Sequence, residues 1–228
     1  MSDAQFDVVV FGATSFVGQI LCQYLTDIYG VDGDLKWAAA GRSKDKLEQV
    51  KAQLGQAGSA LPLLTADAND AASLDTLCAQ TRVVISTVGP YALYGEPMIR
   101  ACVSSGTDYC DLTGEVQWIA AMLEKYEDQA KQSGARIVHC CGFDSIPSDM
   151  GTYFLQQQAR ARFKAPATRV KMRVKVAKGG VSGGTVASMM NIAEVRFEDT
   201  ATGTPYLPSK LTNGPSLNVS VTVSEGNS

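Results

Sequence analysis

The sequence predicts an α/β protein in which a doubly wound parallel sheet is followed by a partial α+β region with antiparallel strands. Short apolar runs alternate six times with helical segments before about Gly142, as in the βαβ units of a parallel sheet. A glycine-rich turn separates the first run from the first helical segment. Over residues 168–178 and 217–223, apolar residues recur at every second position, which is typical of antiparallel strands with one face in water. We therefore expect a Rossmann-type domain over residues 1–145 and the start of a second domain over residues 146–228.

The composition is that of a globular protein with a substantial core, since 45% of the 228 residues are hydrophobic and 19% are charged. The net charge of -3 argues against a nucleic-acid partner, because binding to a phosphate backbone needs a concentrated positive surface. No apolar run approaches the roughly 18 to 20 residues that span a bilayer. The opening residues, MSDAQF, do not resemble a secretory leader. We expect a cytoplasmic protein without an integral membrane segment.

Metal binding is not predicted, because the six cysteines include no CxxC pair and the chain has a single histidine, His139. Most of the cysteines lie among apolar residues, and we interpret them as reduced thiols of the core. His139 lies within an apolar run. That position favours a packed structural imidazole over an acid or base.

The first strand is FDVVVF over residues 6–11, whose β-branched residues and following glycine suit a strand buried on both faces. A helix is predicted over residues 16–24. Another helix, after Glu115, is expected to cover the sheet with an apolar face made of Val116, Ile119, Ala120, Leu123 and Ala130. The remaining predicted strands are LKWAAA (35–40), LPLLTA (61–66), RVVIST (82–87), TDYCDL (107–112) and ARIVHCC (135–141).

The second region opens with an amphipathic strand over residues 168–178, followed by a glycine-rich turn over residues 179–185, a helix and a last strand. So few elements rarely make a self-standing domain, so we expect a truncated chain or a domain completed by a partner such as a second copy. The basic face of the predicted strand over residues 168–178 is interpreted as a solvated surface. The alternative is that this face binds a carrier protein, a coenzyme A phosphate or an anionic lipid headgroup. The patterned residues are Val170, Met172, Val174 and Val176 opposite Arg169, Lys171, Arg173 and Lys175; Val186, Met189, Met190, Ala193 and Phe197 of the helix; and Leu217, Val219, Val221 and Val223 of the last strand.

The turn after the first strand reads GATSFVG, where a dinucleotide-binding fingerprint would read GxGxxG or GxxGxxG. Gly12 permits the tight turn and Gly18 permits close packing of the helix, while Ser15 replaces the middle glycine and has a hydroxyl that can donate to a phosphate. Free backbone amides at the start of the helix favour an anion there. The alternative is a turn that is glycine-rich for steric reasons alone. The expected phosphate site comprises Gly12, Thr14, Ser15, Phe16, Val17 and Gly18.

The end of the second strand favours NADP over NAD. An acid there would bind the ribose 2′-hydroxyl of NAD, whereas a base would pair with the 2′-phosphate of NADP. Arg42 and Ser43 follow Gly41, no acid precedes them, and a guanidinium is well shaped to hold phosphate. The alternative is that Arg42 lies on a surface turn. The other expected cofactor-binding residues are Asp67, Gly89, Pro90 and Tyr91, which follow the third and fourth strands.

Loops after the fifth and sixth strands bring acids and hydroxyls to the same edge of the sheet, where they would orient substrate or relay protons. The alternative is that these side chains cap helices. They are Asp111, Glu115, Asp144, Ser145 and Asp149. The candidate catalytic residues are Tyr91, Glu115 and Asp144.

A YxxxK spacing, typical of short-chain dehydrogenases, occurs at Tyr206 and Lys210. Pro208 lies between them and would break the helix that the pair requires. We therefore reject this pair as a catalytic site.

Six motifs in the same order, GATSFVGQ, AAAGRSKDKL, TVGPYALYGEP, TDYCDLTGE, CGFDSIPSDMG and SGGTVAS, resemble the saccharopine dehydrogenase-like oxidoreductases, which include the trans-acting enoyl reductases of bacterial lipid synthesis. The resemblance implies an NAD(P)-dependent oxidoreductase acting on a small molecule of acyl or lipid type, with peripheral membrane association and homo-oligomers as further expectations. Family members are considerably longer than this chain. The alternatives are a non-catalytic dinucleotide-binding or scaffold protein and an amino-acid dehydrogenase of the saccharopine type.

Overall fold

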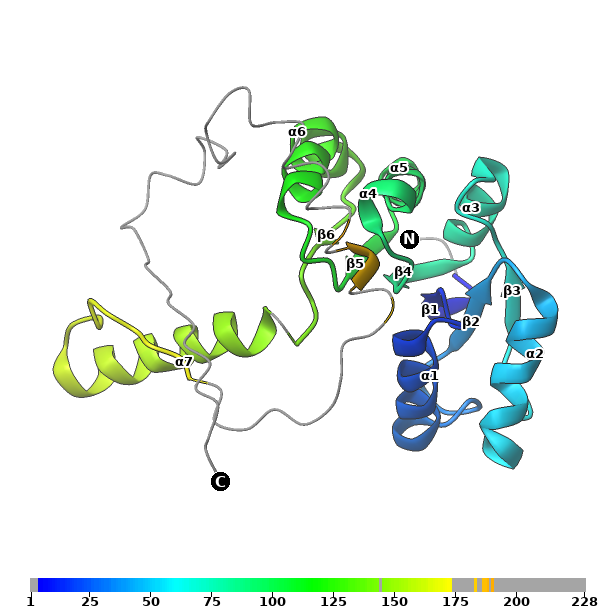
Figure 1. Ribbon diagram of the computed structural model, residues 1–228, viewed down its shortest axis with the longest axis horizontal. Helices are drawn as coiled ribbons and strands as arrows, with labels where there is room; N and C mark the ends of the chain where they lie inside the picture. The colour runs from blue at the N-terminus through cyan, green and yellow to red at the C-terminus, as the bar shows by residue number, and fades with distance from the viewer. Residues whose placement is uncertain (1–3, 144, 174–182, 184–185, 189, 191–228) are drawn as a thin grey trace.

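The computed structural model describes residues 4–143, 145–173, 183, 186–188 and 190. Its centre is a six-stranded, all-parallel sheet with the strand order β3-β2-β1-β4-β5-β6, which confirms the predicted Rossmann-type fold (Figure 1). The strands are β1 (Phe6–Phe11), β2 (Trp37–Gly41), β3 (Leu63–Thr65), β4 (Thr81–Ser86), β5 (Asp108–Asp111) and β6 (Ile137–Val138). The sixth strand is much shorter than the predicted run over residues 135–141.

Helices cover both faces of the sheet. Successive side chains of a strand point to opposite faces, so Val9 of β1 lies in one hydrophobic core and Val10 in the other. The core of Val10 also contains Cys22 and Leu47, from the first two helices, while later helices cover the face of Val9. The helices are α1 (Phe16–Tyr29), α2 (Lys44–Gln53), the 3-10 helix η1 (Gly55–Gly58), α3 (Ala71–Cys78), α4 (Tyr91–Tyr94), α5 (Glu96–Ser105), α6 (Val116–Ser133) and α7 (Ile146–Phe163).

The strand order fixes where a ligand can bind. From β1 the chain passes outward to β2 and β3, and it then returns to the other side of β1 to form β4, β5 and β6. Connections therefore leave in opposite directions at β1 and β4. In open α/β sheets, ligands bind in the crevice at the carboxyl ends of the strands at such a point.

The predicted apolar face of α6 was partly wrong. Val116 and Leu123 are 55% and 41% exposed, whereas Trp118, Met122 and Tyr126 are buried at a spacing of four residues. The aliphatic pattern missed the buried stripe because two of its members are aromatic. Each such ring buries more area than a leucine or valine side chain and therefore decides which face of the helix packs against the core.

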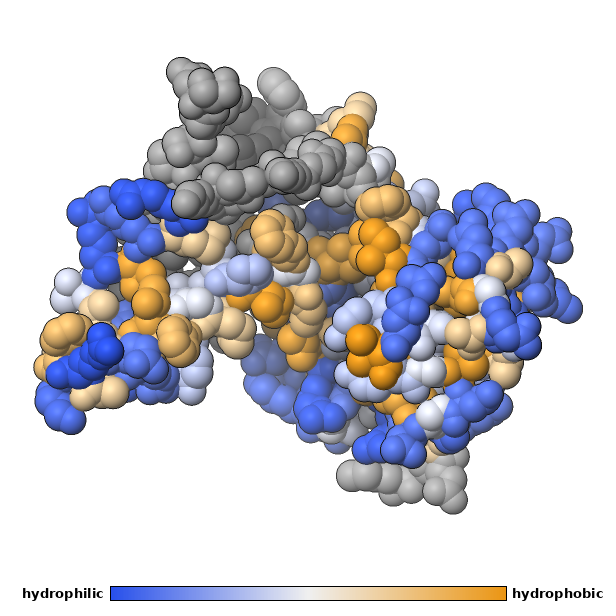
Figure 2. Space-filling view, turned by 90° about the horizontal axis from the view of Figure 1, so that it is seen from below, coloured by the Kyte–Doolittle hydropathy of each residue, from blue (hydrophilic) through white to orange (hydrophobic). Residues whose placement is uncertain are grey.

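The helix α7 lies to one side of the sheet and has no buried residue (Figure 1). In Figure 2, hydrophobic side chains alternate with hydrophilic ones on its surface; Met150, Tyr153 and Phe154 are among the exposed ones. None of the helices in the described part of the chain combines the length and apolarity needed to cross a bilayer.

The second predicted region is described only in part. Residues 168–173, the first half of the predicted amphipathic strand, are not in a strand. Its second half, residues 174–178, lies outside the described residues, as does the last predicted strand, which ends near residue 223. Residues 186–188 are helical, in agreement with the helix expected after the glycine-rich turn.

Candidate functional site: a cleft at the carboxyl ends of the strands

Two positions where β1 meets α1 accept only glycine, one in the turn and one in the first turn of the helix. Gly12 has a φ of +89°, and a Cβ atom there would lie 2.7 Å from both Thr87 Oγ1 and Val88 Cγ2. A Cβ atom on Gly18 would lie 2.2 Å from the carbonyl oxygen of Gly12. The first glycine lets β1 turn sharply beside β4, and the second brings α1 against the strand. The sequence predicted both functions.

Ser15 is the N-cap residue of α1, and its hydroxyl is engaged within the protein. Its Oγ accepts a hydrogen bond from the Gly18 amide at 2.9 Å and lies 3.0 Å from Thr87 Oγ1. Thr87 donates its only hydroxyl proton to the Gly12 carbonyl at 2.9 Å, so Ser15 donates to Thr87. Ser15 therefore joins β1, α1 and β4, and its hydroxyl is not directed at a phosphate. The first amides of α1, which the helix itself leaves without acceptors, remain for an anion.

A cleft of about 260 Å³ lies beside this turn. Its walls come from the residues at and after the carboxyl ends of β1, β2, β3 and β4, where the change in strand direction predicts a ligand. The predicted cofactor residues along the cleft are Gly12, Thr14, Ser15, Arg42, Asp67 and Gly89. Those that do not line it are Phe16, Val17, Gly18, Ser43, Pro90 and Tyr91. Lining residues that the sequence analysis missed include Ala68, Asn69, Val88 and Tyr94.

Arg42 is exposed at the cleft, directly after β2. Among the described residues its guanidinium has no carboxylate partner and no hydrogen-bond acceptor, unlike Arg82, Arg100 and Arg136, which form ion pairs. Ser43 serves a helix instead, because its Oγ accepts a hydrogen bond from the Lys46 amide as the N-cap of α2. The cleft therefore has a cation that the fold itself does not use.

Asp67 shapes the loop after β3. Its Oδ1 accepts hydrogen bonds from the Asn69 amide at 2.9 Å and from Asn69 Nδ2 at 3.3 Å, and its own amide donates to Ser73 Oγ at 3.1 Å. These bonds hold Asp67 and Asn69 side by side at the cleft. A signal for Asn69 existed in the sequence, since Asp and Asn two residues apart commonly form such a turn.

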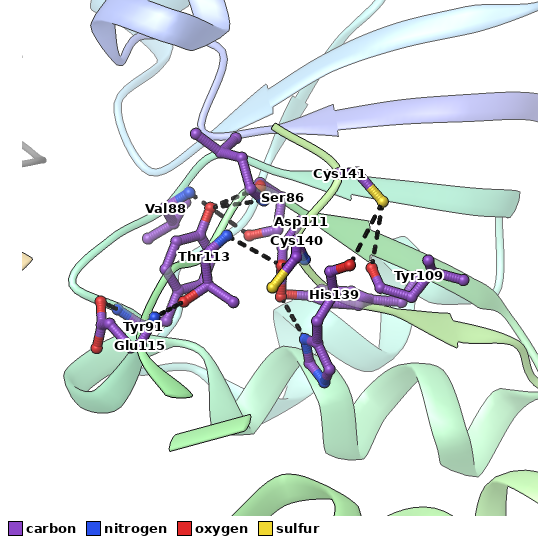
Figure 3. A network of polar contacts seen from close by, with 12 residues as sticks. Ser86, Val88, Tyr91, Tyr109, Asp111, Thr113, Glu115, His139, Cys140 and Cys141 are labelled. Carbon is purple, nitrogen blue, oxygen red and sulfur yellow. Dashed lines mark hydrogen bonds and ion pairs between the residues drawn. The ribbon is translucent and has the colours of Figure 1, made fainter. Parts of the chain in front are cut away.

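Two of the candidate catalytic residues are buried and bonded to the backbone (Figure 3). The Glu115 carboxylate accepts hydrogen bonds from the Tyr91 amide at 2.8 Å and the Ala92 amide at 2.9 Å, and also from Ser188 Oγ at 2.8 Å. It thereby caps the amino end of α4. The Tyr91 hydroxyl donates to the Ser86 carbonyl at 3.0 Å, and burial raises the pKa of Tyr91 well above its usual range. Neither side chain has a polar atom facing the cleft.

Asp111, at the end of β5, is fully surrounded by donors (Figure 3). It accepts hydrogen bonds from the Tyr109 hydroxyl at 3.0 Å and from the Thr113 and Cys140 amides at 3.1 Å each. His139 Nδ1 lies 2.7 Å from Asp111 Oδ2. The predicted packed imidazole of His139 is confirmed, since its side chain is only 7% exposed, but it is also paired with an acid.

Of the remaining acids and hydroxyls predicted at this edge, those that the structure describes do not line the cleft. Asp144 lies outside the described residues. Ser145 precedes α7 without a side-chain hydrogen bond to that helix, and Asp149 is exposed in its first turn. In the part of the chain that the structure describes, no group of three or more His, Cys, Asp or Glu residues is arranged to hold a metal ion.

Comparison with known proteins places these features in a family. The model of the saccharopine dehydrogenase NADP-binding domain matches residues 8–138. A Mycobacterium tuberculosis protein provisionally named a trans-acting enoyl reductase is 43% identical over 195 residues, which are 86% of this chain and 46% of that protein. The trans-acting enoyl reductase of Mycobacterium ulcerans is 39% identical over 191 residues, or 82% of this chain and 45% of that protein. The chain thus spans about half the length of the curated relatives it matches.

A solved structure agrees with the fold. The apo form of a histidine-tagged saccharopine dehydrogenase (L-Glu forming) from Saccharomyces cerevisiae matches with a TM-score of 0.54 and 20% sequence identity, covering 68% of this chain and 32% of that chain. At that identity the likeness concerns the fold alone. The family assignment rests on the sequence match, which extends over more than half of the chain. This chain belongs to the saccharopine dehydrogenase NADP-binding domain family.

Proposed function

We propose that the chain is the cofactor-binding part of an NADPH-dependent oxidoreductase that reduces the carbon-carbon double bond of an acyl or lipid-type substrate. The family match supports the cofactor class, and the names of the mycobacterial relatives support the enoyl substrate. The observation that carries the preference for NADPH is Arg42, an unpaired guanidinium at the cleft beyond β2. A carboxylate at that position would repel a 2′-phosphate, whereas a guanidinium attracts it.

The phosphate groups of the cofactor would have partners in this site. The amides at the start of α1, including those of Phe16 and Val17, would receive the pyrophosphate, and Gly12 and Gly18 allow the sharp turn and the close packing of α1 that present these amides. Arg42 would hold the 2′-phosphate through its unpaired guanidinium. When bound, the reduced nicotinamide supplies the hydride, while the protein supplies orientation and electrostatics.

The size of the cleft supports a proposal for the part of the cofactor that it would hold. Sites for whole drug-sized ligands usually measure about 300–1,000 Å³, so a cleft of about 260 Å³ suits the adenosine and phosphate end of a dinucleotide. The nicotinamide end and the substrate then lie beyond Gly89, toward Pro90 and the loops after β5 and β6. We propose that the second region, starting near residue 146, closes that side.

The first test is a pair of binding titrations with NADPH and NADH, on the full chain and on Arg42→Ala. Loss of a charge-assisted hydrogen bond costs about 1.5–3 kcal/mol, so we expect NADPH binding to weaken about 10- to 100-fold while NADH binding changes little. Arg82→Ala is the matched control. Arg82 lies at the amino end of β4, away from the cleft at the carboxyl ends of the strands, and it forms an ion pair with Asp7. Equal losses for both cofactors would contradict the assignment of Arg42 to the 2′-phosphate.

A second candidate is a non-catalytic dinucleotide-binding protein, which is favoured by the engagement of Tyr91 and Glu115 in the fold. Single-turnover assays with NADPH and enoyl thioesters separate the two candidates, because only a reductase oxidises the cofactor. Parallel assays with saccharopine test for an amino-acid dehydrogenase.

A further inference from the structure

A second cleft lies beside β6, an edge strand of the sheet, and shares no residue with the cofactor cleft. It measures about 250 Å³ and lies between α5, α6 and the edge strand β6. The lining side chains are mostly apolar. They include Ile99, Met122, Leu123, Tyr126, Ala130 and Ile137.

The charges at this cleft are balanced. Glu127 and Lys131, one turn apart on α6, form an ion pair at 2.7 Å. Ile99, Met122 and Tyr126 behind them are buried. A charged ligand would therefore find no uncompensated opposite charge here, and an apolar body would find a matching wall.

One polar side chain of the lining has an atom without a partner. The His139 imidazole is 7% exposed, and its Nδ1 lies 2.7 Å from Asp111 Oδ2. Because Asp111 accepts hydrogen bonds from Tyr109 and from two backbone amides as well, it is a carboxylate and His139 keeps a proton on Nδ1. Among the described residues, no donor or acceptor meets Nε2.

The ring is held in this orientation by its neighbours. Tyr109 and Trp118 both contact it edge to face, with ring centroids 6.1 and 5.2 Å away. Figure 3 shows the ring turned away from Cys141 and from the loop of Thr113, with one nitrogen on Asp111. A buried imidazole with one nitrogen fixed by a carboxylate thus offers its other nitrogen to an apolar cleft.

A hydroxyl group suits Nε2 in either protonation state, because it donates to the bare nitrogen and accepts from the protonated one. The volume limits the rest of the molecule, since a cavity of about 150 Å³ holds benzene. We propose that this cleft is a binding site for a small uncharged molecule that has an apolar body and one hydroxyl group, with the hydroxyl on His139 Nε2. The site is independent of the cofactor and of the proposed reaction.

The test uses the fact that His139 is the only histidine of the chain, so imidazole nitrogen signals in a ¹⁵N NMR spectrum come from it alone. The full chain is titrated with p-cresol and, separately, with toluene, which has the same apolar body without the hydroxyl. We expect a saturable shift of the Nε2 signal with p-cresol, little shift with toluene, and roughly 3- to 10-fold tighter binding of p-cresol. No saturable shift, or equal shifts and affinities for the two probes, would overturn the proposal.

A pair of variants locates the binding. Ala130→Leu fills the cleft and is expected to abolish the p-cresol shift, whereas Ala121→Leu, at an exposed position of the same helix, is expected to preserve it. A thermal melt of each variant shows that it is folded. An undiminished shift in folded Ala130→Leu would place the phenol elsewhere and overturn the proposal. The comparison of p-cresol with toluene needs no variant and stands if Ala130→Leu does not fold.

Discussion

Glu115 is a buried carboxylate with backbone amides on both of its oxygens. In Glu115→Gln the side-chain NH₂ would face one of these amides, and a buried donor would lose its acceptor. We expect the free energy of unfolding to fall by about 1–3 kcal/mol, measured by urea denaturation. Glu124→Gln, at an exposed position of α6, is the control and should be nearly neutral. Equal stabilities of wild type and Glu115→Gln would show that the capping bonds contribute nothing.

Sequence reasoning identified Glu115 and Tyr91 as residues of special chemistry but could not show how they are used. A carboxylate in a loop after a strand has the same sequence signal whether it faces a ligand or a neighbouring helix. The role of Glu115 is decided by its position in space. The helix α4 begins beside this loop, although Tyr91 and Glu115 are 24 residues apart in the chain. Arg42 and Gly12 were easier to place, because each depends on the position directly after its own strand.

At the scale of elements, local patterns predicted β1 and the start of α1 closely. Other boundaries moved: α1 runs on to Tyr29, and β6 keeps only Ile137 and Val138 of its predicted run. The latter is an edge strand with one neighbour, so its length depends on pairing with β5 rather than on its own apolar residues. After β6 the chain turns away at Cys140, which has a φ of 61°.

The contact between α5 and α6 carries a pH dependence. Lys125 forms an ion pair with Glu96, and the Tyr126 hydroxyl donates to Glu96 at 3.0 Å; these bonds hold the pKa of Glu96 below its ordinary value of 4.5. A carboxylate with a lowered pKa stabilises the fold above its ordinary pKa, and this contribution is lost as the pH falls through the lowered value. We therefore expect Glu96→Gln to be less stable than wild type at pH 7 and equally stable at about pH 2. The difference at pH 7 should be small, because the ion pair is largely exposed. Urea denaturation at both pH values measures this, and a stability difference that persists in acid would point to packing instead.

At the scale of the whole molecule, alternation of strands and helices was sufficient to predict the doubly wound sheet, because each βαβ unit repeats the same local signal. The start of the second region was less predictable. The period-two pattern over residues 168–178 predicted a strand, yet residues 168–173 are not in one. A strand needs a neighbour to pair with, and a local alternation pattern does not show whether that neighbour is present.

NADPH is expected to stabilise the α/β unit as a whole, because the cleft is built from the ends of four strands and is lost when any of them unfolds. A ligand that binds only the folded state, at a free concentration 100 times its Kd, adds about 2.7 kcal/mol. For a chain of this size that corresponds to a rise in Tm of about 5–10 °C, measured by thermal melts with and without NADPH. Arg42→Ala should show a smaller rise at the same concentration, and Arg82→Ala the full rise. A ligand that binds only the folded state must raise the stability of that state. An unchanged wild-type Tm would therefore show that NADPH does not bind the cleft and would contradict the proposed function.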